Sequence, residues 1–456
     1  MHVSASSSGE VPDVIGGDGA ASSSRDSATS PPRTSFESIQ LEAMGNQEAA
    51  VTGAPTIWDL DLPVLNTANL DRSESIAAAS ELAKDHWLAR TDVGVAVLRY
   101  RDVASVLRDQ RFHNALSLLR ASVESLETSY LSGRRPSILS AEGPDHTRLR
   151  RLVSPAFTPA AANRHRPTMR RVVTDLLEAH LDAGGCEFVA DICEPYPIPI
   201  ICEVLGAPPS DWRRFSAWAT DVFKIFNGNL DEDLPAIERA SSELDAYVTD
   251  MVEERRSDPR SDLLSELIAV EEEGDRLSNE ELCMLVRAVL LAGTDTTRNQ
   301  LGCAMALFAQ HPDQWAMLVE DPERLAPKAV EESMRYIGAV RATVRVASCD
   351  VPFGGVVFPK GTVVTTNLAA ANRDTTVFAD ADRFDITAER SAEHLTFGSG
   401  IHRCLGAALA RAELQEALTV LARRLAKVVP DGPVTWKPPS FGIWGPASLP
   451  VTFTAR

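Results

Sequence analysis

The segment Thr396–Gly406 holds two closely spaced glycines and a lone cysteine, Cys404, immediately before a long stretch of helical periodicity. Gly398 and Gly400 permit tight backbone turns beside a flat ligand. A thiolate just ahead of a helix is stabilised by the positive end of the helix dipole and by free N–H groups of the first turn. From these residues alone, a buried core cysteine and a zinc pair of His402 and Cys404 both remain open, although no second pair has zinc-like spacing.

The complete string Phe-Gly-x-Gly-x-His-x-Cys-x-Gly, residues 397–406, resembles the haem-binding loop of the bacterial cytochrome P-450 family. Every fixed position of that pattern is filled. The resemblance implies that Cys404 is the axial ligand to the iron of haem b, iron protoporphyrin IX. It also implies that Phe397 and Gly398 lie against the macrocycle and that His402 hydrogen-bonds a haem carboxylate.

A second pattern lies inside the apolar helix that we expect at 279–309, where Leu290–Thr297 contains several poor helix formers. A buried helix with satisfied hydroxyls would account for them, but a broken local rule often marks a functional site. We expect Gly293 to leave room for a small molecule. The string resembles the Ala-Gly-x-Asp-Thr motif of the same family's distal helix, which implies that Asp295 and Thr296 deliver protons for oxygen activation.

Glu332 and Arg335 stand three residues apart on a helix expected at 325–337. Alone they would be an ordinary exposed pair. The surrounding residues resemble the family's ExxR helix, and Ala381–Phe384 resembles its second segment. This implies a buried Glu-Arg-Arg network, completed by Arg383, that holds the loop leading to Cys404.

Further basic residues stand where the family binds the two haem carboxylates. His146 and Arg150 share one face of an expected helix, and Arg345 lies in an expected strand. Surface charge would be the simpler interpretation of any one of them. Together with His402 they provide four donors for two buried anions, which is the pairing that such anions need.

Composition limits the location and the partners of the protein. The net charge of -19 disfavours nucleic acid and anionic membranes as partners. The longest strongly apolar stretch, Cys283–Gly293, is too short for a membrane anchor, and no secretory signal is apparent. The seven cysteines are scattered and never form a CxxC pair, which is typical of reduced thiols. We therefore expect a cytoplasmic protein.

The chain divides into two parts. Residues 1–53 are rich in Ser, Gly, Ala and Pro, and we expect a disordered tail. Residues 54–456 are expected to form one catalytic domain that is mostly α with small β-sheets, which is the triangular fold that the resemblance implies. Neither βαβ alternation nor a GxGxxG motif is present, which disfavours a Rossmann domain. Expected elements include one helix at 160–183 and one strand at 351–358.

The resemblance implies a monooxygenase that inserts one atom of O₂ into a hydrophobic small molecule, by hydroxylation or epoxidation. Oxidative coupling, desaturation or rearrangement, and a non-catalytic haem sensor, remain as alternatives. Electrons are expected from a ferredoxin or flavodoxin with its reductase. A cluster of four arginines is a candidate docking patch, and binding of the haem carboxylates by some of them remains the alternative: Arg148, Arg150, Arg151 and Arg403. The substrate pocket is expected to be lined from five segments, and Arg341 is a candidate for pairing a substrate carboxylate. These segments are Phe112–Leu139, Arg213–Ile237, Val289–Thr296, Ala339–Thr343 and Ser440–Trp444.

Overall fold

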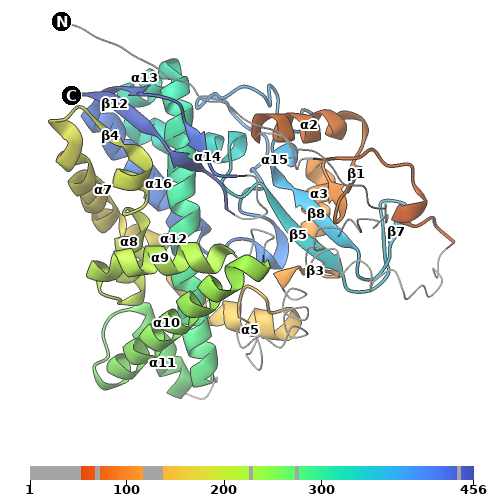
Figure 1. Ribbon diagram of the computed structural model, residues 1–456, viewed down its shortest axis with the longest axis horizontal. Helices are drawn as coiled ribbons and strands as arrows, with labels where there is room; N and C mark the ends of the chain where they lie inside the picture. The colour runs from red at the N-terminus through yellow and green to blue at the C-terminus, as the bar shows by residue number, and fades with distance from the viewer. Residues whose placement is uncertain (1–52, 67–71, 117–136, 225–229, 273–276, 439–442) are drawn as a thin grey trace, which may run out of the picture. The chain divides into compact units, whose positions relative to one another are not determined.

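The computed structural model describes residues 53–66, 72–116, 137–224, 230–272, 277–438 and 443–456. The expected tail at 1–53 lies outside these residues except for Gly53. The expected mostly-α fold with small sheets is confirmed (Figure 1). The helices are α2 (Arg72–Asp85), α3 (Tyr100–Arg108), α5 (Gly143–Val153), α6 (Pro159–Arg164), α7 (Arg166–Leu181), α8 (Pro197–Leu205), α9 (Trp212–Phe223), α10 (Leu230–Ser257), α11 (Leu263–Glu272), α12 (Asn279–Gln310), α13 (Pro312–Glu320), α14 (Pro322–Tyr336), α15 (Leu368–Ala371) and α16 (Ala407–Arg424).

Short strands form small sheets. They are β1 (Leu88–Thr91), β2 (Gly94–Val97), β3 (Phe112–Asn114), β4 (Gly185–Glu187), β5 (Ala342–Ala347), β6 (Val351–Phe353), β7 (Val356–Phe358), β8 (Val363–Asn367), β9 (Leu425–Pro430), β10 (Thr435–Trp436), β11 (Pro446–Ser448) and β12 (Pro450–Ala455). The largest sheet has the order β1-β2-β8-β5-β3, in which only β2 and β8 pair in parallel. In it Arg345 of β5 pairs with Asn114 on one side and Val364 on the other.

Helix α12 is the long central helix in Figure 1, and it contacts α8, α9, α10, α14 and α16. Its start is defined by a capping box, in which Ser278 accepts from the Glu281 N–H at 3.2 Å and Glu281 accepts from the Ser278 N–H at 2.9 Å. Most of its residues are buried, as expected of a helix surrounded by others. The poor helix formers at 293–297 do not break it, because tertiary packing on several sides outweighs their weak propensity.

Helix α16 is the other helix that positions the site. It packs between α14 and α7 and also contacts α12. It begins at Ala407, three residues after Cys404, as the helical periodicity predicted. Its buried face includes Leu414, Leu418 and Leu421, which belong to the main hydrophobic core. Packing on three neighbours therefore holds the start of α16, and the cysteine before it, at one position.

Two local predictions were wrong, and one helix was missed. The expected helix at 160–183 is two helices, α6 and α7, which meet at His165; Pro167 has no N–H to donate, so it favours a first helical turn there. The expected strand at 351–358 is a hairpin, which turns at Gly354 and Gly355 with φ of 60° and 84°. Helix α8 was missed although it carries both boundary signals: Pro197 in its first turn and Gly206 after its end, with φ 84°.

None of the helices in the described part of the chain combines the length and the apolar character needed to cross a membrane.

Candidate active site

A cavity of about 320 Å³ lies where α5, α12, α16 and β5 meet the cysteine loop. Of the nine residues predicted for the site, eight line this cavity: Thr296, His146, Arg150, Arg345, Phe397, Gly398, His402 and Cys404. Asp295 does not line it. The structure thus brings together residues that are more than 250 positions apart in the sequence.

The cysteine loop is built by short backbone hydrogen bonds. The Gly398 N–H donates to the Leu395 carbonyl at 2.7 Å, and the Cys404 N–H donates to the Phe397 carbonyl at 2.8 Å. Gly398 and Gly400 have φ of 69° and 73°, a conformation that glycine adopts without strain. At Gly400 a Cβ would lie 2.4 Å from the carbonyl oxygen of Leu107, so α3 can approach only a glycine.

Two opposing effects act on the pKa of the Cys404 thiol. Desolvation by the surrounding protein raises the pKa of its thiol, whereas the Gly406 N–H and the charges of Arg150, Arg411 and Arg403 act to lower it. These are the donor and charges that the expected thiolate ahead of a helix requires.

Phe397 is held by a cluster that the sequence interpretation did not anticipate. The guanidinium of Arg411, on the second turn of α16, lies 4.6 Å from the centre of the Phe397 ring. Glu331 accepts from Arg411 at 2.7 and 2.9 Å, and the His394 ring lies 5.6 Å from Phe397. Burial alone would raise the pKa of Glu331, but hydrogen bonds from Arg411 and His394 lower it to about 2.

The Glu-Arg-Arg network is present, but its third member is Arg390 and the prediction of Arg383 was wrong. Arg335 donates to both carboxylate oxygens of Glu332 at 2.8 Å, and Arg390 donates to the same two oxygens at 3.1 and 2.6 Å. The side chain of Arg383 is 67% exposed and pairs with Asp385 at 3.4 Å. Only the backbone carbonyl of Arg383 joins the network, as an acceptor from Arg335 at 3.0 Å.

This network reaches the cysteine loop through Asn372. Arg335 donates to the Asn372 carbonyl at 3.0 Å. The Asn372 side chain accepts from the Leu395 N–H at 2.7 Å and donates to the Thr396 hydroxyl at 3.0 Å. The chain of contacts ends one residue before Phe397, so a buried ion pair on α14 fixes the start of the loop.

The residues predicted to bind carboxylates gather on one side of the cavity. The rings of His146 and His402 lie 4.3 Å apart. Burial, together with the charges of His402 and Arg150, lowers the pKa of His146 to about 4. Glu142, which the sequence interpretation missed, accepts from His402 at 2.9 Å and from the Asn114 N–H at 2.5 Å.

Arg345 is nearly fully buried, and burial lowers its pKa to about 10. Its Nη1 donates to the Val344 carbonyl at 3.1 Å and to the Thr343 hydroxyl at 3.5 Å. No acid of the described residues lies within ion-pair distance of it. The other arginine of this group, Arg150, donates a hydrogen bond to the Arg403 carbonyl at 2.5 Å.

These features test whether the cavity fits haem b, a flat ring that carries two carboxylates. Two donors on the cavity fit the haem carboxylates. The buried Nδ1 of His146 has no hydrogen-bond partner among the described residues, and the Arg345 guanidinium donates only to a backbone carbonyl and a hydroxyl. Near Gly398 and Gly406 no atom lies within 4 Å of where a Cβ would stand. Open space beside these two glycines of the cysteine loop and the two buried donors both fit the group.

Thr296 and Asp295 face in different directions from α12. The Thr296 hydroxyl donates back to the Ala292 carbonyl at 3.1 Å and lines the cavity. Asp295 is buried and forms an ion pair with Arg298, one turn away on the same helix. Arg298 also reaches the hydroxyls of Ser216 and Thr220 of α9, at 3.4 and 3.3 Å.

The expected room beside Gly293 is taken by the protein itself. A Cβ at this position would lie 2.7 Å from Ile201 of α8, so the glycine permits two helices to pack closely, while both residues still border the cavity. A predicted substrate-binding residue, Arg341, is not on the cavity. Its guanidinium lies 5.0 Å from the centre of the Trp444 ring.

Three of the five expected pocket segments contribute to the cavity: 112–139, 289–296 and 339–343. No described residue of 213–237 or 440–444 lines it. Lining residues outside the expected segments include Ile201, Gln300 and Glu413, and none of these three stood out in the sequence. Gln300 donates to the Ile337 carbonyl at 3.2 Å and accepts from the Ala339 N–H at 2.8 Å, which joins α12 to the segment before β5.

The zinc pair of His402 and Cys404 that the sequence left open gains no further ligands in the described part of the chain. The described residues contain no group of three or more His, Cys, Asp or Glu side chains that could hold a metal ion.

Comparisons with known proteins agree with this site. The family model described as Cytochrome P450 matches residues 210–442. The luteothin monooxygenase of Streptomyces thioluteus is 37% identical over 397 residues, which cover 87% of this chain and 97% of the relative. The mycinamicin IV hydroxylase/epoxidase of Micromonospora griseorubida is 36% identical, and the match covers 78% of this chain and 89% of the relative.

Solved structures lead to the same family. Cytochrome P450 CYP109Q5 from Chondromyces apiculatus has a TM-score of 0.75 and 33% identity, and the match covers 84% of this chain and 95% of that one. These matches cover most of the chain and are not restricted to the short cysteine motif. The chain therefore belongs to the cytochrome P450 family and is a bacterial-type monooxygenase that uses haem b.

Proposed function

We propose that the protein inserts one oxygen atom of O₂ into a hydrophobic small organic molecule, by hydroxylation or epoxidation, in the cavity that Cys404 lines. The main support for this proposal is the apolar character of the residues that line the cavity. Beside the predicted site residues, most of the side chains that α12 and the segment 339–340 present to the cavity are apolar: Ala288, Val289, Ala292, Ala339 and Val340. An apolar lining with a few convergent polar groups is the usual form of a small-molecule site.

Cys404 would hold the iron, and His146, Arg345, His402 and Arg150 would hold the haem carboxylates. When bound, haem supplies the oxidising chemistry that transfers an oxygen atom to the substrate. Phe397, packed between Arg411 and the loop, and Gly398 would lie against the ring. The protein's own contribution is to orient this group and to keep its charges paired.

Thr296 would hold a proton at its Oγ1 where the substrate and oxygen meet, because this hydroxyl lines the cavity. Asp295 would supply protons from the side of α12 that faces α9, through its ion pair with Arg298. An acid and an alcohol in this order can pass a proton inward without exposing the cavity to bulk water.

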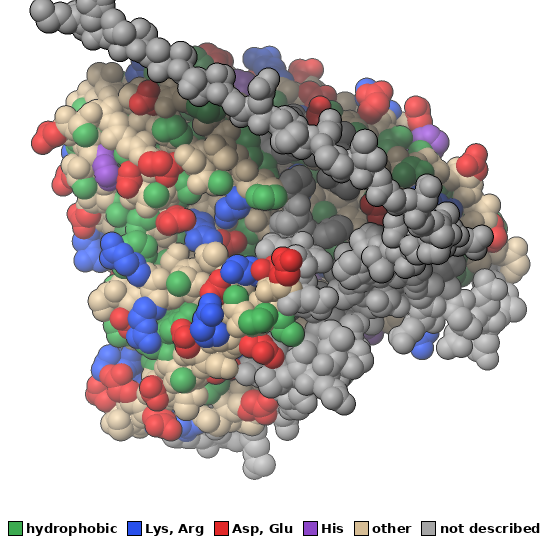
Figure 2. Space-filling view, in the orientation of Figure 1, with side chains coloured by type: hydrophobic (Ala, Val, Ile, Leu, Met, Phe, Trp, Pro, Cys, Tyr) green, Lys and Arg blue, Asp and Glu red, His purple; other side chains and the backbone are tan. Residues whose placement is uncertain are grey.

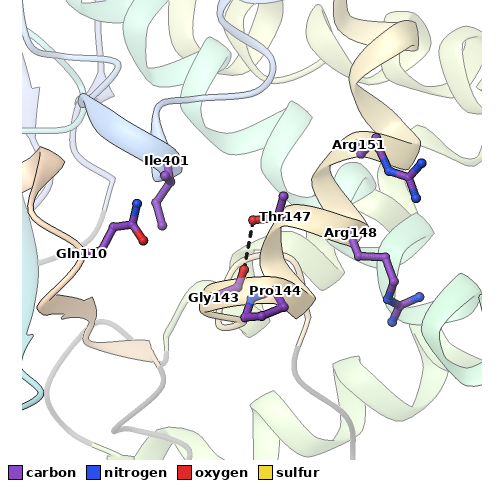
Figure 3. A pocket seen from close by; sticks show the side chains of 7 residues that line it. All are labelled: Gln110, Gly143, Pro144, Thr147, Arg148, Arg151 and Ile401. Carbon is purple, nitrogen blue, oxygen red and sulfur yellow. Dashed lines mark hydrogen bonds between the residues drawn. The ribbon is translucent and has the colours of Figure 1, made fainter.

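We further propose that a ferredoxin or flavodoxin, with its reductase, supplies the electrons and docks beside α5. A depression of about 620 Å³ lies there on the surface, lined by Gln110 and Ile401 on one side and by Thr147, Arg148 and Arg151 of α5 on the other (Figure 3). Figure 2 shows acidic and basic side chains intermingled on the face that it presents. Arg148 also pairs with Glu281, and Arg403 pairs with Glu393 at 2.9 Å.

A cytoplasmic location is the remaining part of the proposal. It is supported by the seven cysteines, none of which forms a disulfide. Reduced thiols are the usual state in the cytoplasm.

The test is a titration of ferric holoprotein with a panel of apolar compounds that includes luteothin and mycinamicin IV. A binder is expected to shift the Soret band saturably, and turnover under isotopically labelled O₂ should place one labelled oxygen atom in the product. If bound compounds are coupled or desaturated without gaining labelled oxygen, the proposed reaction is wrong.

A further inference from the structure

Two cations beside the cavity have no anionic partner, and the proposed function uses neither of them. Arg341 comes directly before β5, and Lys437 directly follows β10. Both side chains are partly buried. Neither forms an ion pair or a side-chain hydrogen bond with any of the described residues. Because it is costly to take a charge out of water without a partner, these two side chains are candidates for binding an anion.

A stacked pair of tryptophans joins the two cations. The Arg341 guanidinium lies 5.0 Å from the centre of the Trp444 ring. The Trp436 ring stacks on Trp444, with ring centres 4.6 Å apart and an angle of 7° between the planes. The indole N–H of Trp444 donates to the backbone carbonyl of Lys437 at 2.8 Å. A guanidinium that rests on an aromatic face keeps its N–H edges available, and their geometry matches the two oxygens of a planar carboxylate.

The charges around the two cations do not neutralise them. Burial lowers the pKa of Arg341, and no acid of the described residues acts to raise it. Burial also lowers the pKa of Lys437; Asp295 and Glu194 act to raise it, whereas Arg298 acts to lower it. Asp295 and Arg298 already form an ion pair with each other, so together they present little net charge to Lys437. The protein thus leaves a local excess of positive charge at this position.

The cluster adjoins the cavity wall without being part of it. The backbone N–H of Trp444 donates to the Ala339 carbonyl at 2.9 Å. Ala339 and Val340 line the cavity, and Arg341 is the next residue in the chain. An anion held by Arg341 would therefore lie just beyond this part of the apolar wall.

The cluster also lies away from the residues that would hold the haem carboxylates. Side chains alternate along an extended strand, and Thr343 and Arg345, which line the cavity, occupy the second and fourth positions after Arg341. At about 3.3 Å per residue, Arg341 is roughly 13 Å from Arg345 along this segment. Arg341 is therefore free to bind a different anion.

We propose that Arg341 and Lys437 bind a carboxylate of the substrate, so that the protein selects elongated molecules with an apolar body and one acidic end. This rests on the proposed monooxygenase function and narrows its substrate class. The apolar body would occupy the cavity, and the carboxylate would extend past Ala339 and Val340. Since oxygen is inserted inside the cavity and the carboxylate is held outside it, the oxidised carbon is remote from the acid group.

The first test is a titration of ferric holoprotein at pH 7 with decanoic, dodecanoic and tetradecanoic acids, each beside its methyl ester, followed by the Soret shift. The acids should bind wild type at least about tenfold more tightly than their esters, as expected for hydrogen bonds to a charged group. Arg341→Gln should remove this preference by weakening the acids and leaving the esters unchanged. Arg341→Lys should retain part of it, and Lys437→Gln should reduce it in the same direction.

Arg90→Gln is the matched control. Arg90 is also partly buried and lies 5.5 Å from the centre of the Trp58 ring, but it does not line the cavity and follows no wall residue. This variant should bind acids and esters as wild type does. Haem content and melting temperature of every variant show whether the fold is intact, and Lys437→Gln decides the point if Arg341→Gln does not fold.

The second test is the position of the oxygen atom in the products of the acid that binds most tightly. Wild type should oxygenate it within a narrow set of carbons far from the carboxylate, and Arg341→Gln should broaden this distribution. If no acid binds more tightly than its ester, or if the preference survives both Arg341→Gln and Lys437→Gln, the inference is overturned. Oxygenation of neutral compounds would then leave the proposed function standing. Desaturation of acids whose preferential binding is intact would instead contradict the proposed reaction and leave the carboxylate site in place.

Discussion

The guanidinium of Arg390 donates hydrogen bonds to both carboxylate oxygens of Glu332, at 3.1 and 2.6 Å. Since Arg335 binds the same two oxygens from within α14, one buried carboxylate is shared by two cations. Burial alone would raise the pKa of Glu332, and the two arginines hold it below its usual value. This pairing joins the segment around 390 to α14 and, through Asn372, to the cysteine loop.

Arg390→Ala is expected to yield little folded holoprotein, whereas Arg383→Ala should behave as wild type. Removing one partner of a buried ion pair costs about 3–5 kcal/mol, and Glu332→Ala and Arg335→Ala should be at least as damaging. Arg383 is largely exposed, so its loss costs little. Haem content and melting temperature of the four variants decide the point, and a stable, haem-replete Arg390→Ala would contradict it.

The stability of the protein should fall with rising pH because of Glu413. Its folded pKa of about 8 is above the ordinary 4.5, so its contribution is complete below 4.5 and is lost as the pH rises toward 8. The slope is about 1.4 kcal/mol per pH unit for one such group. Denaturant unfolding of the haem-free protein at pH 5, 6, 7 and 8 should show a weaker slope for Glu413→Gln. Parallel slopes would mean that the carboxyl ionises normally.

Thr296→Ala should uncouple turnover without harming the fold. Alanine has the better helix propensity, and Thr296 lies on α12 outside the cysteine loop, so haem binding should survive. Reductant should still be consumed but appear mainly as hydrogen peroxide, whereas Asp295→Asn should slow the whole cycle. The measurement is product formed per reductant consumed, with peroxide assayed in parallel. Full coupling with a substrate that lacks hydroxyl groups would remove Thr296 from the mechanism.

Deleting residues 1–50 should leave haem content, melting temperature and turnover nearly unchanged. The segment is rich in Ser, Gly and Ala and poor in aromatics, so it cannot bury enough apolar surface to support the catalytic domain. A drop of several degrees in melting temperature would show that the segment packs on the domain.

Residues in contiguous patterns were predictable from the sequence. Cys404, His402 and Phe397 lie within ten residues whose spacing is itself the signal, and the structure places all three on one cavity. The start of helix α12 was predicted correctly, and its end was predicted to within one residue. Both a capping residue and an apolar length are local properties of the sequence.

Residues that depend on burial or on long-range pairing were not predictable. Arg383 and Arg390 are both arginines in the same irregular segment, and only the fold reveals which of them reaches Glu332. Glu413 is one of two acids in α16, and its raised pKa arises from burial that only the fold reveals. The sequence suggested that Gly293 leaves room for a ligand. In the fold the side chain of Ile201, more than ninety residues earlier in the chain, packs against this glycine.

Thiolate ligation by Cys404 is the central claim, and the spectrum of the reduced carbon monoxide complex tests it most directly. Wild-type protein, with one haem per chain, should show the red-shifted Soret band of a thiolate-ligated haem. Cys404→Ser should lose that band, while Cys349→Ser, which removes an exposed cysteine elsewhere, should retain it. An unchanged red-shifted band in Cys404→Ser would contradict the account.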